Sequence, residues 1–273
     1  MDLHGSIAAV SVEVKGEIFK ALIRSWVLKS SNAVSHYYGK FPVPRVAIEI
    51  HAIEGQKVGG GVTFPGEIPR ITIRVGRNAT ESELLHSDWT MVHEMIHLAF
   101  PWMANKHNWM TEGLAVYIES ISRVQVGHLS EERIWSDFTK MMPRGLPQAT
   151  DGGFEISASW GRTYWGGAMF CLLADVRIRV ETDNKWGLQH ALRAFNSKRD
   201  FRQEWDFLET LTIGDAATGR NVLVSLYEEM KSEAVSPDLE ALWRNLGIVK
   251  SSSGISFDDT APLANIRKAI ITV

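Results

Sequence analysis

Apolar positions near the start of the chain predict a helix followed by a small sheet. Over residues 12–38 the apolar side chains recur at helical spacing. Over residues 46–50 and 71–75 they alternate with polar ones, the period of two that is typical of strands. Three glycines at positions 59–61 lie between these segments, and such a run indicates a bulge or a close backbone approach at a sheet edge. We therefore expect a sheet whose edge lies at these glycines.

Two further helices are predicted after the sheet. Thr80 and Glu83 have the spacing of a capping box, and the apolar pattern that follows is helical until Pro101 stops it. A second helical pattern begins at Trp109 and continues to about Val124. The two helices are therefore separated by a short connection.

Most of the remaining chain has the apolar pattern of helices. Its loops are rich in Gly, Pro, Asp and Ser, and residues 255–273 have the pattern of a strand or a short helix. The predicted helices cover residues 161–180, 186–196, 202–211, 218–231 and 237–246. These elements predict an α+β fold in which an α/β sublobe, residues 1–142, precedes a mainly α-helical lobe, residues 143–273, the two forming one functional unit.

Composition narrows the class of protein. The chain has 273 residues, 45% hydrophobic and 22% charged, which is typical of globular domains. A net charge of −3 without a basic cluster argues against nucleic acid as a partner, and the single cysteine, Cys171, has no intramolecular partner. The chain has no run of about 18 apolar residues, so no membrane span is predicted. Residues 1–14 lack a signal-peptide pattern, so we expect a cytoplasmic protein, or an extracytoplasmic one if a leader has been removed. The pattern does not indicate an oligomeric state.

The segment His93-Glu94-Met95-Ile96-His97 is an HExxH motif. It lies on the helix predicted between Thr80 and Pro101. Residues four apart lie about 40° from one another around a helix, so His93 and His97 can bind the same ion. Glu94 points to the same side but further round, where it can hold a metal-bound water and act as a general base. A catalytic zinc site uses three protein ligands and leaves one position open, so a third ligand is needed.

Glu112 is the strongest candidate for the third metal ligand. It lies in the first turn of the following helix, which can pack antiparallel to the first and bring this carboxylate to the metal. His107 is the alternative ligand, although its position predicts a solvent-exposed loop residue. Glu119 lies two turns beyond Glu112 on the same face, where a second carboxylate could orient an imidazole ligand.

HExxH followed by Trp-x-x-Glu-Gly-x-Ala-x-Tyr at residues 109–117 resembles the gluzincin metallopeptidases, and most nearly the aminopeptidase N and glycyl aminopeptidase families. The resemblance implies a zincin-like catalytic domain, one zinc ion and a peptide or protein substrate. Tyr164, which precedes two glycines and an apolar helix, is similar to the tyrosine with which those families donate a hydrogen bond to the oxyanion. We therefore expect a zinc metallopeptidase.

The chain departs from these families at the sheet edge. Their G-x-M-E-N motif, which supplies a glutamate for the free amino terminus of the substrate, has no counterpart, and Gly59, Gly60 and Gly61 stand in its place. Aminopeptidase and endopeptidase action both remain open, as does pairing of an extended peptide with this edge. A catalytically inactive scaffold that binds peptides or a partner protein is the alternative to an enzyme.

Overall fold

The computed structural model describes residues 1–13, 16–156, 159–198, 204–252 and 254–272. Contacts divide it into two compact units. We call residues 1–102 the N-terminal unit, and residues 103–198 with 205–272 the helical unit. Residues 103–142 are expected from the sequence to belong with the sheet, whereas their contacts lie in the helical unit.

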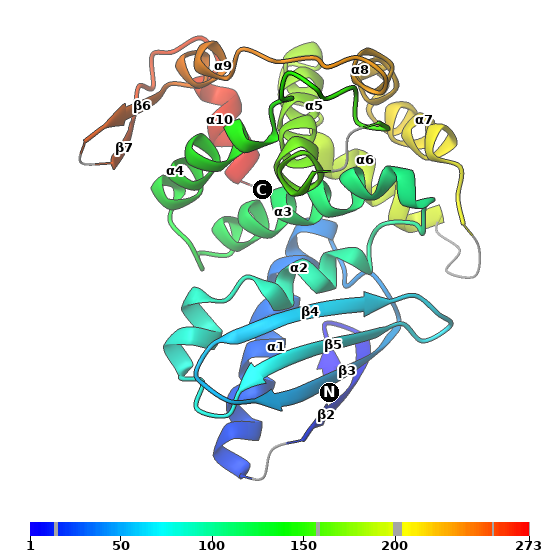
Figure 1. Cartoon of the computed structure of the whole chain (residues 1–273), viewed down its shortest axis with the longest axis vertical. Helices are drawn as coiled ribbons and strands as arrows, with labels where there is room; N and C mark the ends of the chain where they lie inside the picture. Colours follow the sequence, from blue (N-terminus) through cyan, green and yellow to red (C-terminus); the bar gives the residue numbers. More distant parts are fainter. Residues whose placement is uncertain (14–15, 157–158, 199–203, 253, 273) are drawn as a thin grey trace. The chain divides into compact units, whose positions relative to one another are not determined.

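A five-stranded sheet forms the centre of the N-terminal unit (Figure 1). β3 pairs in parallel with β2 and with β5, and β4 runs antiparallel to β5. The order is β1-β2-β3-β5-β4, with β1 (Asp2–Leu3), β2 (Ser6–Val12), β3 (Arg45–Ile53), β4 (Val58–Phe64) and β5 (Arg70–Gly76). The predicted strands are therefore present, and the glycines at 59–61 lie on the edge strand β4, where the register shifts. Strands β1 and β2 are not predicted from the sequence.

One face of this sheet supplies the core of the N-terminal unit. Alternate side chains on β3 and β5 are fully buried, as the period of two requires; they are Val46, Ile48, Ile50, Ile71, Ile73 and Val75. Helices α1 (Glu17–Tyr38) and α2 (Thr90–His97) accompany the sheet in this unit (Figure 1). α2 packs against the edge strand β4 and its neighbour β5.

The helix predicted from Thr80 to Pro101 is divided in the structure. A π-helical turn, η1 (Glu83–Ser87), precedes the shorter helix α2. At the break, the Asp88 carboxylate accepts hydrogen bonds from the Met91 backbone N–H at 3.2 Å and from the Trp26 indole N–H at 3.1 Å. Such a side chain satisfies the orphan N–H groups of a new helix. Asp88 therefore starts α2 and ties it to α1.

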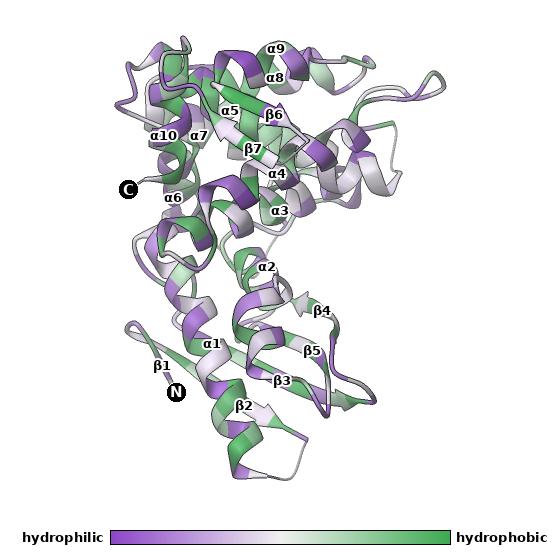
Figure 2. Cartoon of the chain, turned by 90° about the vertical axis from the view of Figure 1, so that its left-hand side faces the viewer, coloured by the Kyte–Doolittle hydropathy of each residue, from purple (hydrophilic) through white to green (hydrophobic). Residues whose placement is uncertain are grey.

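The helical unit is built around α5 (Gly167–Glu181), which contacts α3, α6, α8 and α10. Figure 2 shows hydrophobic residues along α5, and most of its residues are buried. The other elements are η2 (Asn105–His107), α3 (Asn108–Gln125), α4 (Glu131–Met141), η3 (Met142–Gly145), η4 (Gly161–Gly166), α6 (Leu188–Lys198), α7 (Phe207–Thr218), α8 (Val222–Met230), α9 (Leu239–Asn245), β6 (Ile248–Ser251), β7 (Gly254–Phe257) and α10 (Ala264–Ile271).

The predicted helices of this unit are present with shifted ends, and α4 was not predicted. Residues 202 and 203 of the predicted helix 202–211, and residue 273 of the predicted tail, lie outside the described residues. The tail forms a strand as well as a helix, β7 and α10. No helix in the described parts of the chain is long and apolar enough to cross a membrane.

A glycine contact explains why α3 packs in the helical unit. A Cβ added at Gly113 would lie 2.2 Å from the backbone carbon of Gly167, so the backbones of α3 and α5 touch at this point. One turn further along α3, the Tyr117 hydroxyl donates a 3.0 Å hydrogen bond to the Asp175 carboxylate on α5. Two residues of the 109–117 motif, Gly113 and Tyr117, thus join α3 to α5.

Candidate metal centre

Two imidazoles lie one turn apart on α2. The ring centroids of His93 and His97 are 4.8 Å apart, with the ring planes at 87°. His93 is buried, and the exposed indole of Trp89 meets its ring edge-on at 5.2 Å. The spacing of four residues therefore places both rings on one side of the helix, as the sequence predicts.

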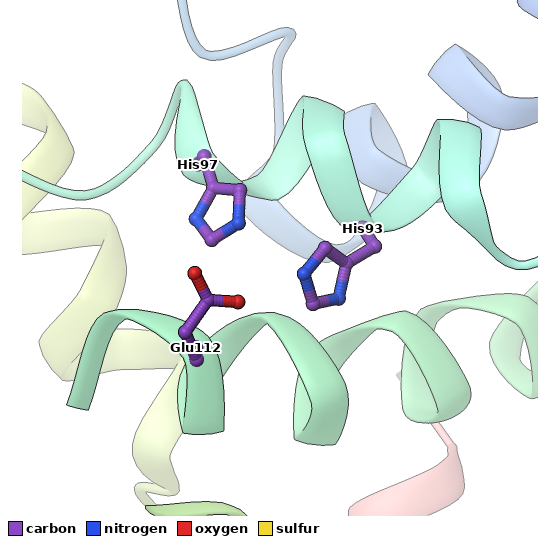
Figure 3. Close-up of side chains that lie close together, drawn as sticks. All are labelled: His93, His97 and Glu112. Carbon is purple, nitrogen blue, oxygen red and sulfur yellow. The ribbon is translucent and has the colours of Figure 1, made fainter. Parts of the chain in front are cut away.

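The Glu112 carboxylate, in the first turns of α3, completes a group of three possible metal ligands. One ligand atom from each of His93, His97 and Glu112 lies within 4.8 Å of the others. Figure 3 shows both rings and the carboxylate directed toward one another. Two imidazoles and one carboxylate are the ligand set of many catalytic zinc sites, in which a fourth position stays open. The types of donor atom therefore fit zinc.

Glu94 is buried against the edge strand of the sheet. Only 5% of its surface is exposed. The Thr63 hydroxyl on β4 lies 2.6 Å from its carboxylate oxygen Oε2 and 2.9 Å from its backbone oxygen. The sequence does not predict this contact, because nothing local in the sequence shows that residues 63 and 94 meet.

Gly61 makes room for the Glu94 side chain. A Cβ added at Gly61 would lie 2.7 Å from Glu94 Cγ and 3.1 Å from Oε1. Contacts this short force one group to move, and the flexible side chain moves more readily than the strand. The glycine predicted to allow a close approach at the edge therefore approaches Glu94.

Replacing Gly61 by Ala should displace the Glu94 carboxylate without unfolding the N-terminal unit. If Glu94 is the general base, we expect kcat for peptide cleavage to fall by roughly a hundredfold, the cost of about 1 Å of misplacement. Gly59→Ala is the matched control, because a Cβ there would meet the end of the Ile53 side chain instead. Steady-state kinetics and thermal melting of both variants check this prediction, and equal kcat values would contradict it.

Glu119 lies buried on α3 beside a cation. Its carboxylate forms an ion pair with Arg123 and accepts a 3.0 Å hydrogen bond from the Ser120 hydroxyl. Both charged side chains are more than nine-tenths buried. A buried carboxylate requires such partners to remain ionised. The structure therefore places Glu119 in a local charge pair.

His107 is buried, which corrects the prediction of an exposed loop residue. It ends the short helix η2, and its ring stacks on Phe207 with centroids 4.1 Å apart. Its Nδ1 lies 3.6 Å from the Glu155 carboxylate. Burial of Glu155 opposes ionisation, but hydrogen bonds from Tyr227 and Lys106 outweigh it and lower the pKa of that carboxyl. The sequence could not show this, because these partners are distant along the chain.

Tyr164 lies in the π-helical turn η4, just before α5. Its ring stacks on the exposed Trp160 ring at a centroid distance of 5.8 Å. The guanidinium of the buried Arg162 in the same turn donates a 2.8 Å hydrogen bond to the Gly145 carbonyl. The turn is therefore anchored to η3 through Arg162.

Comparison with solved structures identifies proteins with a similar fold. An aminopeptidase N family protein from Idiomarina loihiensis matches with a TM-score of 0.63 and 14% identity, over 90% of this chain and 48% of that one. An M1 zinc metallopeptidase from Deinococcus radiodurans matches with a TM-score of 0.52 and 13% identity, over 84% and 48%. A variant of the latter bound to a Tyr-Ser-Ala substrate gives a TM-score of 0.52 at 12% identity, over 84% and 48%.

These matches concern the fold. No protein-family model matches the chain, and no curated protein matches it by sequence. The chain spans about half the length of the solved structures named above. Their identities of 12–14% are too low to carry an activity from one protein to another. The chain is thus a mixed α+β protein with an N-terminal sheet, and its fold is similar to that of M1 zinc metallopeptidase domains.

Proposed function

We propose that this chain is a zinc-dependent peptidase in which His93, His97 and Glu112 hold one zinc ion. The observation that carries the proposal is the group of three ligand atoms within 4.8 Å of one another. Zinc bonds to nitrogen and oxygen are about 2.0–2.2 Å long, so binding would draw the three donors slightly closer together. The similarity of the fold to zinc metallopeptidases is in accord with this ligand set.

Glu94 is the general base of the proposed reaction. When bound, zinc supplies a Lewis acid that polarises the scissile carbonyl and lowers the pKa of water to about 7. Glu94 accepts a proton from the attacking water and passes it to the leaving amine. Glu94 directly follows His93 on α2, so its carboxylate lies near the proposed ligands but is not one of them.

Two further residues complete the proposed machinery. Tyr164 donates a hydrogen bond to the oxyanion, which stabilises charge that develops only in the transition state. Glu119, held by Arg123, acts behind the metal ligands to orient an imidazole. The role of Tyr164 predicts a loss in kcat with zinc affinity unchanged, whereas the role of Glu119 predicts a loss of zinc affinity as well.

The proposed substrate is a peptide or protein. One of the Deinococcus structures holds a Tyr-Ser-Ala substrate, and a related two-domain M1 zinc metallopeptidase holds L-arginine. In this chain β4 is the edge strand of the sheet, and its side that faces away from β5 can pair with an extended peptide. Removal of the first residue and cleavage of an internal peptide bond are both compatible with that arrangement.

Product mapping tests this function. The purified protein, loaded with one zinc per chain, is incubated with a mixture of peptides, and the products are identified by mass spectrometry. Some peptides should carry a free amino terminus and others an acetylated one. We expect cleavage. If the peptides with a free amino terminus are cleaved and the acetylated ones are not, the protein is an aminopeptidase. Absence of products from every peptide despite bound zinc would favour the inactive binding scaffold.

A further inference from the structure

The hydroxyl group of Thr63 connects the edge strand of the sheet to the proposed general base. We propose that Thr63 is a positioning residue, which holds Oε2 of Glu94 so that Oε1 is the oxygen that accepts the proton from water. The inference rests on the proposed function and adds a residue outside HExxH to it. Both residues belong to the N-terminal unit.

The geometry on β4 explains how one strand can fix this carboxylate. Residues two apart on a strand face the same side, so Gly61 and Thr63 both face Glu94. A Cβ at Gly61 would crowd Cγ and Oε1 of Glu94, whereas Thr63 lies 2.6 Å from Oε2. The first residue leaves room for the side chain, and the second holds one of its two oxygens.

The sheet and the residue type both limit movement of the Thr63 hydroxyl. Thr63 pairs with Ile71 on β5, whose side chain is fully buried. A β-branched side chain such as threonine also has few accessible rotamers. The hydroxyl position is therefore set by the backbone of β4, and the carboxylate is held against a fixed point.

The Thr63 hydroxyl is suited to both protonation states of Glu94. A hydroxyl has one hydrogen, which it can donate either to Oε2 or to the Glu94 backbone oxygen, 2.9 Å away. Donation to an ionised carboxylate is the stronger of the two. When water gives its proton to Oε1, the carboxyl becomes neutral and the hydroxyl can turn to the backbone oxygen without losing a partner. The proton then leaves Oε1 for the amine, and the first arrangement returns.

The backbone contact also has a structural reading. The last four carbonyls of a helix lack intrahelical donors, and Glu94 is one of the last four residues of α2. A hydroxyl that only capped this helix end would affect stability and the placement of His93 and His97. Zinc affinity therefore separates a capping role from a positioning role, because both histidines lie on the same helix.

Replacement of Thr63 by Val and by Ser tests the inference. Valine keeps the shape and removes the hydroxyl, and serine keeps the hydroxyl. We expect Thr63→Val to lower kcat by roughly tenfold to a hundredfold with KM and zinc affinity unchanged, and Thr63→Ser to restore most of the rate. Thr72→Val, on the neighbouring strand opposite Val62, is the matched control. Equal kcat for Thr63→Val and wild type, or equal losses in Thr63→Val and Thr63→Ser, would overturn the inference.

A second readout is independent of catalysis. Crystal structures of the metal-free Thr63→Val and Thr63→Ser proteins should show Glu94 Oε2 displaced from β4 in the first and retained in the second. An unmoved carboxylate in Thr63→Val would also overturn the inference. If wild type cleaves peptides but Thr63→Val and Thr63→Ser have equal kcat values, only the proposed role of Thr63 fails. If wild type with bound zinc cleaves nothing, the proposed function fails and this role fails with it.

Discussion

Replacement of Glu94 by Gln is expected to lower kcat by roughly 10²–10⁴-fold, the contribution typical of a positioned general base. Glutamine has the same shape as glutamate but cannot accept the proton of water at neutral pH. Because Glu94 is not one of the three proposed ligands, zinc content should stay at one per chain. The loss corresponds to about 3–5 kcal/mol of transition-state stabilisation.

The matched control for this variant is Glu81→Gln. Glu81 is exposed and lies in the segment before α2, so the substitution removes the same charge from the same unit. Rates should be measured at saturating peptide, with zinc determined on the same samples. If Glu94→Gln cleaves peptides as fast as Glu81→Gln, Glu94 is not the base.

Replacement of Glu112 by Gln is expected to weaken zinc binding by more than about a hundredfold. Even the loss of an outer-sphere partner of a metal ligand typically costs 10–100-fold in affinity, and here a ligand itself loses its charge. Competition with a chromogenic zinc chelator measures this affinity directly. Peptide cleavage should fall with zinc occupancy and recover in part at high zinc concentration.

His107→Asn tests the alternative third ligand. Because the His107 ring is buried and stacked on Phe207, this variant should lose thermal stability but keep the zinc affinity of wild type. A large loss of zinc affinity in His107→Asn, with little loss in Glu112→Gln, would transfer the role of ligand from Glu112 to His107.

The parts of the site that the sequence predicts are those with a local signature. The spacing of His93 and His97 determines their common side of one helical turn, whatever the rest of the chain does. Strands β3 and β5 were visible in the alternation of buried and exposed positions. The three glycines indicated a sheet edge, and one of them, Gly61, is where β4 approaches Glu94.

The parts that escaped prediction depend on residues that are distant along the chain. The capping pattern after Thr80 predicted one long helix, but Asp88 breaks it, with Trp26 of α1 as a partner. His107 looked exposed because Phe207, the ring that covers it, is far away in sequence. For the same reason, no pattern within β4 could show that the hydroxyl of Thr63 meets Glu94.

Anomalous diffraction at the zinc absorption edge, from crystals of the zinc-loaded protein, tests the central claim most directly. We predict one strong peak per chain, bonded to one nitrogen each of His93 and His97 and to a carboxylate oxygen of Glu112, at about 2.0–2.2 Å. A peak at other side chains, or a zinc ion bound to the two histidines with the Glu112 carboxylate turned away, would contradict it.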